Sequence, residues 1–298
     1  VINGETSIAA GSKVVSVDDA PHKAAENIGL MAEGRKNPTA PAPLTAWTNG
    51  DFEIENHGTI DFSVAEKSTA IFSNSARAKN DGIIKVGKNS TAIYGFYDST
   101  TRTYEVVPPA VALPNKLEIE TTSNSKISLG DKSTGMYLIN AEKVENKGGQ
   151  ITSAVGATKN VGIYAINGAV DKGNAKDNSI YNKSQNYKTL NMVTATNITL
   201  GNGSVGLYSK GQSNNVRNSV TNTGNITIGS KITVSKTENY PSVAMYAENT
   251  NLNTNSNVTV GNDGIAFYGK NSDITAKGSV NFSNNGVLAY LENSKFVS

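Results

Sequence analysis

Two short stretches, Asn80-Asp81-Gly82-Ile83-Ile84-Lys85-Val86 and Ser90-Thr91-Ala92-Ile93-Tyr94, decide the fold of this chain. The first is an Asn-x-Gly turn that leads into alternating apolar residues. The second joins a β-branched residue, a small residue, an apolar residue and an aromatic residue. Alternation with β-branched residues predicts strands, and Gly and Asn between them supply the positive φ angles that sharp corners need.

The second pattern recurs nine times along the chain. The copies start at residues 27, 68, 90, 133, 160, 204, 242, 264 and 286, so the successive spacings are 41, 22, 43, 27, 44, 38, 22 and 22. Three spacings of 22 set the period. We interpret 41, 43 and 44 as two periods with one copy missing or degraded, and 27 as one period with an insertion. The Asn-x-Gly element recurs before several copies, at 56–62, 146–151 and 222–228.

A degenerate repeat of about 22 residues predicts a right-handed parallel β-helix, a solenoid formed by residues 1–298 as one segment. Short strands cannot bury an apolar face alone, but coils stacked about 4.8 Å apart pair each strand with its copy one period on. We therefore expect an inner aliphatic column, a Tyr/Phe column and ladders of Asn side chains at the corners. At most roughly 13 coils fit in the chain. A β-sandwich, the competing fold, predicts no such regular spacing. The pattern leaves open which strand positions face inward.

Composition excludes several classes of function. The net charge of +2 offers no basic field for nucleic acid or acidic lipid. The chain has no cysteine, which excludes disulfides, thiolate metal sites and a cysteine nucleophile. No apolar run approaches the roughly 18 residues of a membrane span. No signal peptide opens the sequence, and we expect the chain to be a piece of a longer protein.

Catalytic and metal-binding motifs are not found either. The sequence contains no HExxH, P-loop or dinucleotide-binding glycine pattern. The stretch 171–177 lacks the ligand spacing of a calcium loop. His22 and His57 lie in unrelated contexts, and we expect His57 to be a solvated turn residue. We therefore expect no enzyme, no cofactor, no metal and no catalytic residue.

Four breaks interrupt the repeat, near 32–50, 97–116, 167–190 and 230–241. Six of the eight prolines lie in the first two breaks, and proline cannot donate to a sheet ladder. Insertions in a repeat array map to loops, often on a binding face, and aromatic residues and arginine dominate recognition surfaces. The candidate binding residues are Trp47, Tyr97, Arg102, Tyr104, Tyr181 and Tyr187. The alternative is that these side chains only pin the loops onto the rod.

The succession of Asn-x-Gly-x-Ile and Ser-x-Gly/Ala-Ile-Tyr resembles the passenger domains of bacterial autotransporters. The cysteine-free, Asn-, Lys-, Ser- and Thr-rich style is most similar to the very large fusobacterial outer-membrane adhesins, of the galactose-inhibitable lectin-like or arginine-inhibitable type. This resemblance implies display on the bacterial cell surface, anchoring through a C-terminal membrane β-barrel absent from this segment, and a role in adhesion and virulence. It carries no binding residue over to this chain.

These observations predict an adhesin segment, a rigid rod that presents loops to a host-cell surface protein or glycan receptor, or to partner bacteria. We expect a monomer that binds no nucleic acid and does not insert into a membrane. A purely structural stalk, with the binding site elsewhere in the parent protein, is the alternative. A β-helical glycan-cleaving enzyme would require two carboxylates within catalytic reach in a groove.

Overall fold

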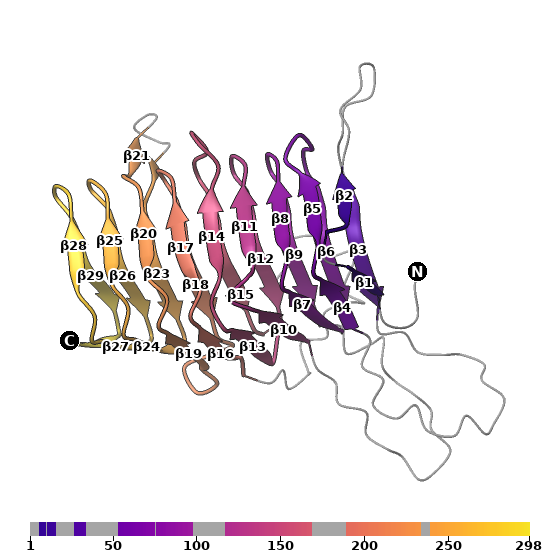
Figure 1. Cartoon of the computed structure of the whole chain (residues 1–298). Helices are drawn as coiled ribbons and strands as arrows, with labels where there is room; N and C mark the ends of the chain where they lie inside the picture. Colours follow the sequence, from indigo (N-terminus) through magenta and orange to yellow (C-terminus); the bar gives the residue numbers. More distant parts are fainter. Residues whose placement is uncertain are drawn as a thin grey trace, which may run out of the picture.

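The computed structural model describes residues 6–9, 11–15, 27–33, 53–74, 76–97, 117–168, 189–233 and 239–298. Within these ranges the chain is all-β and forms three parallel sheets that wind as a right-handed β-helix (Figure 1). The predicted fold class is therefore confirmed. None of the described residues forms a helix long and apolar enough to cross a membrane.

We name the three sheets I, II and III in the order in which the chain enters them. Sheet I consists of β1 (Thr6–Ile8), β4 (Glu53–Asn56), β7 (Arg77–Asn80), β10 (Glu118–Thr121), β13 (Lys143–Asn146), β16 (Asn191–Thr194), β19 (Asn218–Asn222), β24 (Thr250–Thr254), β27 (Asp273–Ala276) and β30 (Lys295–Val297). Sheet II consists of β2 (Lys13–Val15), β5 (Thr59–Phe62), β8 (Ile83–Val86), β11 (Lys126–Leu129), β14 (Gln150–Ser153), β17 (Asn197–Leu200), β20 (Ile226–Ile228), β25 (Val258–Val260) and β28 (Val280–Phe282). Sheet III consists of β3 (Ile28–Glu33), β6 (Thr69–Asn74), β9 (Thr91–Phe96), β12 (Thr134–Ile139), β15 (Val161–Ile166), β18 (Val205–Lys210), β23 (Val243–Glu248), β26 (Ile265–Lys270) and β29 (Val287–Glu292). A small antiparallel hairpin, β21 (Ile232–Thr233) with β22 (Asn239–Tyr240), branches off between β20 and β23.

Each coil contributes one strand to each sheet, and every strand pairs in parallel with its counterpart in the next coil. The described residues form nine such coils, numbered here from β1–β3 to β27–β29, and β30 begins a tenth. This number lies below the upper limit of roughly 13 coils, because insertions take up part of the chain. The spacings near twice 22 contain no missing copy, because β3 pairs directly with β6, β9 with β12, and β15 with β18. Those coils carry long insertions instead.

Each coil has three strands, whereas the repeat pattern predicts two per period; the strand of sheet I was not predicted. In β4, β7 and β10 the outward positions hold charged residues and the inward positions offer only one aliphatic residue each: Ile54, Ala78 and Ile119. The apolar alternation is therefore too short to stand out. The Asn of the Asn-x-Gly turn is the last, buried residue of this strand in coils 2 and 3, as Asn56 and Asn80 show.

The core is a set of aliphatic columns that run along the rod. The inward column of sheet II contains Ile60, Ile84, Ile127, Ile151, Ile198 and Ile226, each at most 1% exposed. The inward column of sheet III contains Ile71, Ile93, Met136, Ile163, Leu207, Met245 and Phe267, which are equally buried. The structure thus settles the inward parity: in the repeat the apolar residue points inward and the aromatic residue outward. Burying each such aliphatic side chain contributes about 2 kcal/mol.

The small residue of the repeat is required by close packing between coils. A Cβ at Gly162 would lie 2.4 Å from the carbonyl oxygen of Gly206 and 2.9 Å from Cγ2 of Ile198. The same position holds Ala in other coils, for example Ala70 and Ala244, which are fully buried. Only Gly or Ala fits between the backbone of the next coil and the sheet II core.

Polar ladders hold the corners in register. At the corner between sheets I and II, Nδ2 of Asn56 donates to Oδ1 of Asn80 (2.7 Å), and Nδ2 of Asn80 donates to Oγ of Ser125 (2.5 Å). The expected ladder of Asn side chains is thus present, and in the later coils Asn146 and Asn222 alternate with Thr121, Thr194 and Thr254. At the uninterrupted corner between sheets III and I, a single left-handed Asn turns the chain, as Asn140 (φ 56°) and Asn271 (φ 50°) do.

Candidate binding surfaces

The three longest insertions leave the rod at one corner, where the chain passes from sheet III to sheet I. We name this corner, from coil 1 to coil 6, the insertion edge. Between the flanking strands lie 19 residues after β3 (34–52), 21 after β9 (97–117) and 24 after β15 (167–190). Uninterrupted corners need only one to three residues, as at 249 and at 140–142. The three insertions therefore emerge from coils 1, 3 and 5, on the same side of the scaffold.

Tyr97 is the one predicted binding residue that the described part of the chain contains. Its backbone N–H donates to the carbonyl oxygen of Ile139 in the next coil (3.0 Å), and its partly buried side chain packs against the core. Tyr97 therefore anchors the root of the second insertion, which agrees with the pinning interpretation for this residue. The other predicted binding residues, Trp47, Arg102, Tyr104, Tyr181 and Tyr187, lie outside the described residues, as do His22 and the stretch 171–177.

The aromatic residues of the repeat form a continuous stack on the outer face of sheet III. The stacked rings are Phe72, Tyr94, Tyr137, Tyr164, Tyr208, Tyr246, Tyr268 and Tyr290, with centroids 4.4–5.4 Å apart between neighbours. Each inner ring is covered on both faces by its neighbours, so these rings cannot also stack on a sugar. Burial raises the pKa of Tyr137 and Tyr164 above the ordinary phenol value, which keeps both neutral. The column is structural, as the repeat indicated.

A longer loop and a hairpin lie at the corner between sheets II and III in coils 5 to 7. The loop 154–160 supplies three of the five extra residues in the 27-residue spacing, because it has seven residues where corners such as 130–133 have four. The corners 140–142 and 147–149 supply one more residue each. The hairpin β21–β22, part of the fourth break, folds beside it. Nζ of Lys159 lies 3.8 Å from the ring centroid of Tyr240. Gly203 has no side chain, and Ile232 of the hairpin packs in the space that a side chain would occupy. The loop and the adjacent turn border a shallow cavity of about 360 Å³ lined by Ser153, Thr158, Thr199 and Asn202.

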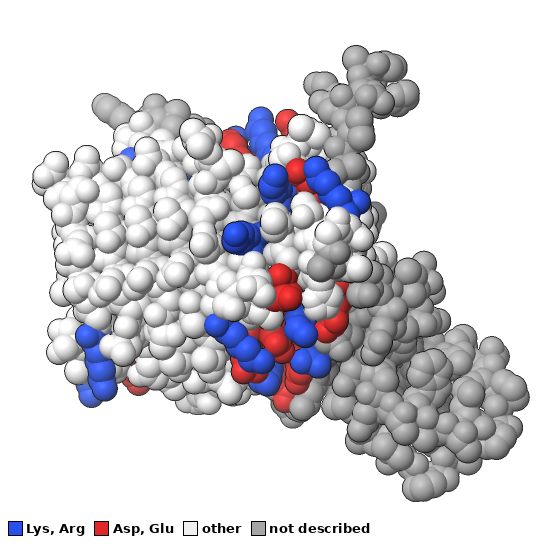
Figure 2. Space-filling view, in the orientation of Figure 1, with Lys and Arg blue, Asp and Glu red and all other residues white. Residues whose placement is uncertain are grey.

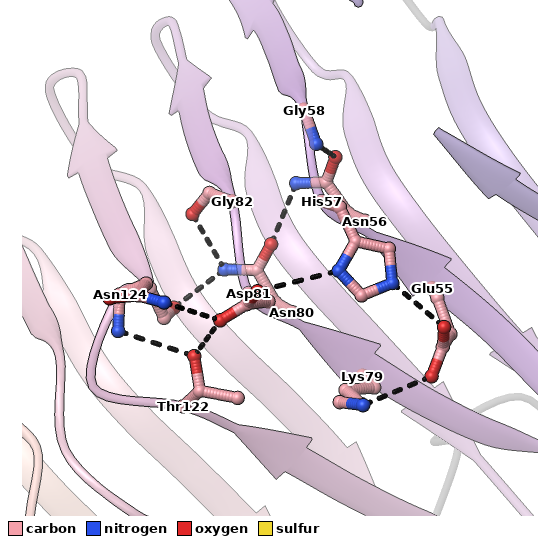
Figure 3. A network of polar contacts seen from close by, with 11 residues as sticks. Glu55, Asn56, His57, Gly58, Lys79, Asn80, Asp81, Gly82, Thr122 and Asn124 are labelled. Carbon is pink, nitrogen blue, oxygen red and sulfur yellow. Dashed lines mark hydrogen bonds and ion pairs between the residues drawn. The ribbon is translucent and has the colours of Figure 1, made fainter. Parts of the chain in front are cut away.

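A polar network spans coils 2 to 4 at the corner between sheets I and II (Figure 3). The His57 ring lies between two carboxylates, with Nε2 2.8 Å from Oε2 of Glu55 and Nδ1 3.4 Å from Oδ2 of Asp81. The bond to Glu55 is the main reason why the pKa of His57 is raised and that of Glu55 is lowered. His57 lies in the expected turn and is partly exposed, with 31% of its side chain accessible, but its ring is also paired with two carboxylates, one of them in the next coil.

Further residues on both sides of this network pair with its charged groups. Asp81 accepts hydrogen bonds from the Thr122 hydroxyl and from Nδ2 of Asn124 (3.1 Å), and the Thr122 bond is the main cause of its lowered pKa. Nζ of Lys79 lies 3.1 Å from Oε1 of Glu55. Each charged group in Figure 3 thus contacts another member of the network, which indicates a structural link between coils.

Charge is distributed unevenly along the rod (Figure 2). In coils 2 to 5 the outer face of sheet I carries neighbouring residues of opposite sign: Glu120 bridges Arg77 (3.0 Å) and Lys147 (3.0 Å). On sheet II Asp61 lies between Lys13 (3.5 Å) and Lys85 (3.3 Å). The same view shows a broad surface without charged residues over the C-terminal coils.

Within the described ranges, no three His, Asp or Glu side chains gather closely enough to hold a metal ion. No protein-family model, no curated protein and no solved structure matches this chain.

Proposed function

We propose that this chain is a segment of a bacterial cell-surface adhesin, a rigid β-helical rod that presents loops to a host-cell protein or glycan receptor or to partner bacteria. The observation that carries the proposal is the insertion edge. Three insertions of 19 to 24 residues leave one corner from coils 1, 3 and 5. Successive roots are two coils apart, about 10 Å along the rod.

A rigid scaffold with loops gathered on one side is the usual way in which proteins position binding residues. The described outer faces of the N-terminal coils offer little to a ligand, because their charges pair with one another and their tyrosine rings cover each other. Recognition is therefore assigned to the insertions, which contain Trp47, Arg102 and Tyr104. The resemblance to autotransporter passengers supports display at the outer membrane through a C-terminal β-barrel outside this segment.

The test replaces the first two insertions, each with a corner that the rod already uses. Replacing 98–116 with one Ala joins Tyr97 to Leu117 through a corner as long as 140–142, which links β12 to β13. Replacing 34–52 with Ser-Ala copies the corner 75–76 between β6 and β7. The purified fragment and both variants are then compared on a glycan array, on receptor ectodomains and on host and bacterial cells. We expect binding by the fragment and its loss in at least one variant.

The control is the shorter loop 213–216 after β18, which is exchanged for Gly-Ser residues of equal length while Gln212, which lies against Gly168 of the third insertion, is kept. A purely structural stalk is the second candidate function. Two observations favour the stalk: the polar side chains at the corners hydrogen-bond to one another, and the Tyr97 side chain packs against the core. A well-folded, β-rich fragment that binds no cell, receptor or glycan would establish the stalk and overturn the adhesive role of this segment.

A further inference from the structure

The tyrosine column of sheet III brings phenol rings of neighbouring coils within reach of one another. In the described stack the shortest separation joins Tyr246 of β23, in coil 7, to Tyr268 of β26, in coil 8. Their ring centroids lie 4.4 Å apart, and the angle between the ring planes is 6°. The two residues are direct partners in the parallel ladder. Both side chains are partly exposed, so the pair is accessible to small molecules in solvent.

A carboxylate of the next coil lies beside this pair. The Tyr268 hydroxyl donates a hydrogen bond to Oε1 of Glu292 in β29, and this bond is the main reason why the pKa of Tyr268 is raised. The corresponding bond from the Tyr208 hydroxyl to Glu248 is longer, at 3.4 Å, and Nζ of Lys210 lies 3.1 Å from the same carboxylate. Tyr268 is therefore the better placed of these two phenols to pass its proton to a carboxylate when the ring loses an electron.

We propose that Tyr246 and Tyr268 form a site of oxidative cross-linking, at which a one-electron oxidant of the peroxidase or peroxyl-radical class joins the two rings as dityrosine. Each phenol gives one electron to the oxidant and loses one proton. The proton of Tyr268 passes to Glu292, and that of Tyr246 passes to water. The two phenoxyl radicals then form a carbon–carbon bond between their ortho positions. The hydrogens of these two carbons move to the phenolic oxygens, so two electrons and two protons leave in all.

The fold favours coupling of these two rings over coupling between two molecules. Stacking turns an encounter of two radicals into a reaction within one chain, which raises their effective concentration strongly. The torsion that carries a tyrosine ring is broad, so the ortho carbons can approach while the side chains keep their positions on the strand. The link joins residues 22 positions apart and ties coil 7 to coil 8. In a chain without cysteine, it constrains the unfolded state as a disulfide does elsewhere.

The experiment treats the purified chain, at low concentration, with a haem peroxidase and hydrogen peroxide. Cleavage after Glu248 and Lys270 places Tyr246, Tyr268 and Tyr290 in separate peptides. Mass spectrometry then identifies linked peptides, which together are two hydrogen atoms lighter than the free ones, and fragmentation locates the joined residues. We expect the link between Tyr246 and Tyr268 to be the main one, in a product of monomer mass. In urea its yield should fall by about tenfold, because the stack is lost.

Two substitutions separate the coupling from the packing. Tyr268→Phe keeps a ring in the column, where Phe72 already stacks on Tyr94 at 5.3 Å, but it has no phenol to oxidise. This variant should lose the link to Tyr246 and keep its fold, which circular dichroism checks. Glu292→Gln removes the proton acceptor and should slow formation of the link by about threefold or more.

The matched control for the carboxylate is Asp263→Asn. Asp263 is exposed in the turn before β26 and has a left-handed backbone (φ 55°) that Asn adopts readily. This variant removes the same charge from coil 8 and should leave the rate unchanged. Links that form mainly between molecules, or equally well in urea, overturn the proposal, because the stack then does not direct the coupling. Equal rates for Glu292→Gln and Asp263→Asn overturn the role of Glu292 as proton acceptor.

Discussion

Asn80 links coils 2, 3 and 4 through one buried side chain. Its amide accepts from Asn56 and donates to both Ser125 and the carbonyl oxygen of Gly82 (3.2 Å). We predict that Asn80→Ala lowers the free energy of unfolding by about 2 kcal/mol or more, because it leaves two buried polar groups without partners. Asn281→Ala, at an exposed outward position of β28, should stay within about 0.5 kcal/mol. Denaturant unfolding measures both, and equal losses would contradict the ladder.

His57 gives the stability of coils 2 to 4 a defined pH dependence. Its pKa is raised in the folded state, so its contribution is complete below the ordinary value of 6.5 and is lost as the pH rises through the folded pKa. The lowered pKa values of Glu55 and Asp81 have the opposite sense, and their contribution is lost as the pH falls below about 4. The network is therefore strongest between these limits, near pH 5 to 6.

We predict that His57→Gln destabilises the chain by roughly 0.5 kcal/mol near pH 5.5, since the pairs are partly exposed. The difference from the unchanged chain should narrow as the pH rises to about 8.5. Unfolding curves at several pH values provide the measurement. A difference that is independent of pH between 5.5 and 8.5 would show that the ring acts without its charge.

At the scale of the strand, the stacked rings of sheet III support each coil through its two neighbours. Tyr208 lies 4.6 Å from both Tyr164 and Tyr246, whereas the terminal Tyr290 stacks on Tyr268 alone (5.1 Å). We predict a loss of about 1–3 kcal/mol for Tyr208→Leu, since two stacked pairs disappear, and about half of that for Tyr290→Leu. Thermal unfolding compares the two variants. Similar losses would mean that apolar area, which Leu largely retains, matters more than stacking.

The strands of sheets II and III could be predicted from the sequence, and those of sheet I could not. Ile83-Ile84-Lys85-Val86 and Thr91-Ala92-Ile93-Tyr94 combine alternation with β-branched residues, so their local pattern already indicates strand. Glu53-Ile54-Glu55-Asn56 offers one aliphatic residue between two acids, and only the neighbouring coils make it a strand. Pairing between coils is a tertiary effect that a local pattern does not contain.

At the scale of the whole molecule, the corner from which each insertion leaves can be assigned only once the third strand of each coil, the strand of sheet I, is known. The breaks near 32–50, 97–116 and 167–190 were visible in the sequence, but with two strands per coil they could not be assigned to a common corner. Likewise, the extra residues at 154–160 and the hairpin β21–β22 are far apart in the chain, and only the stacking of coils 5 to 7 brings Lys159 onto Tyr240. Which loops lie next to one another in space can therefore be predicted only when the number of strands per coil is known.

A stack of coils that each contact only their neighbours should respond to damage locally. Ile198 lies at the centre of the rod, fully buried in β17 and against Gly162 of the preceding coil. We predict that Ile198→Ala costs about 2–5 kcal/mol and lowers amide hydrogen-exchange protection mainly in β14, β17 and β20, while β5 and β8 keep theirs. Thr199→Ala, the outward neighbour of Ile198, is the control and should change neither. If protection falls equally in every coil, the rod unfolds as one cooperative unit, and its coils are coupled over a longer range than nearest-neighbour packing provides.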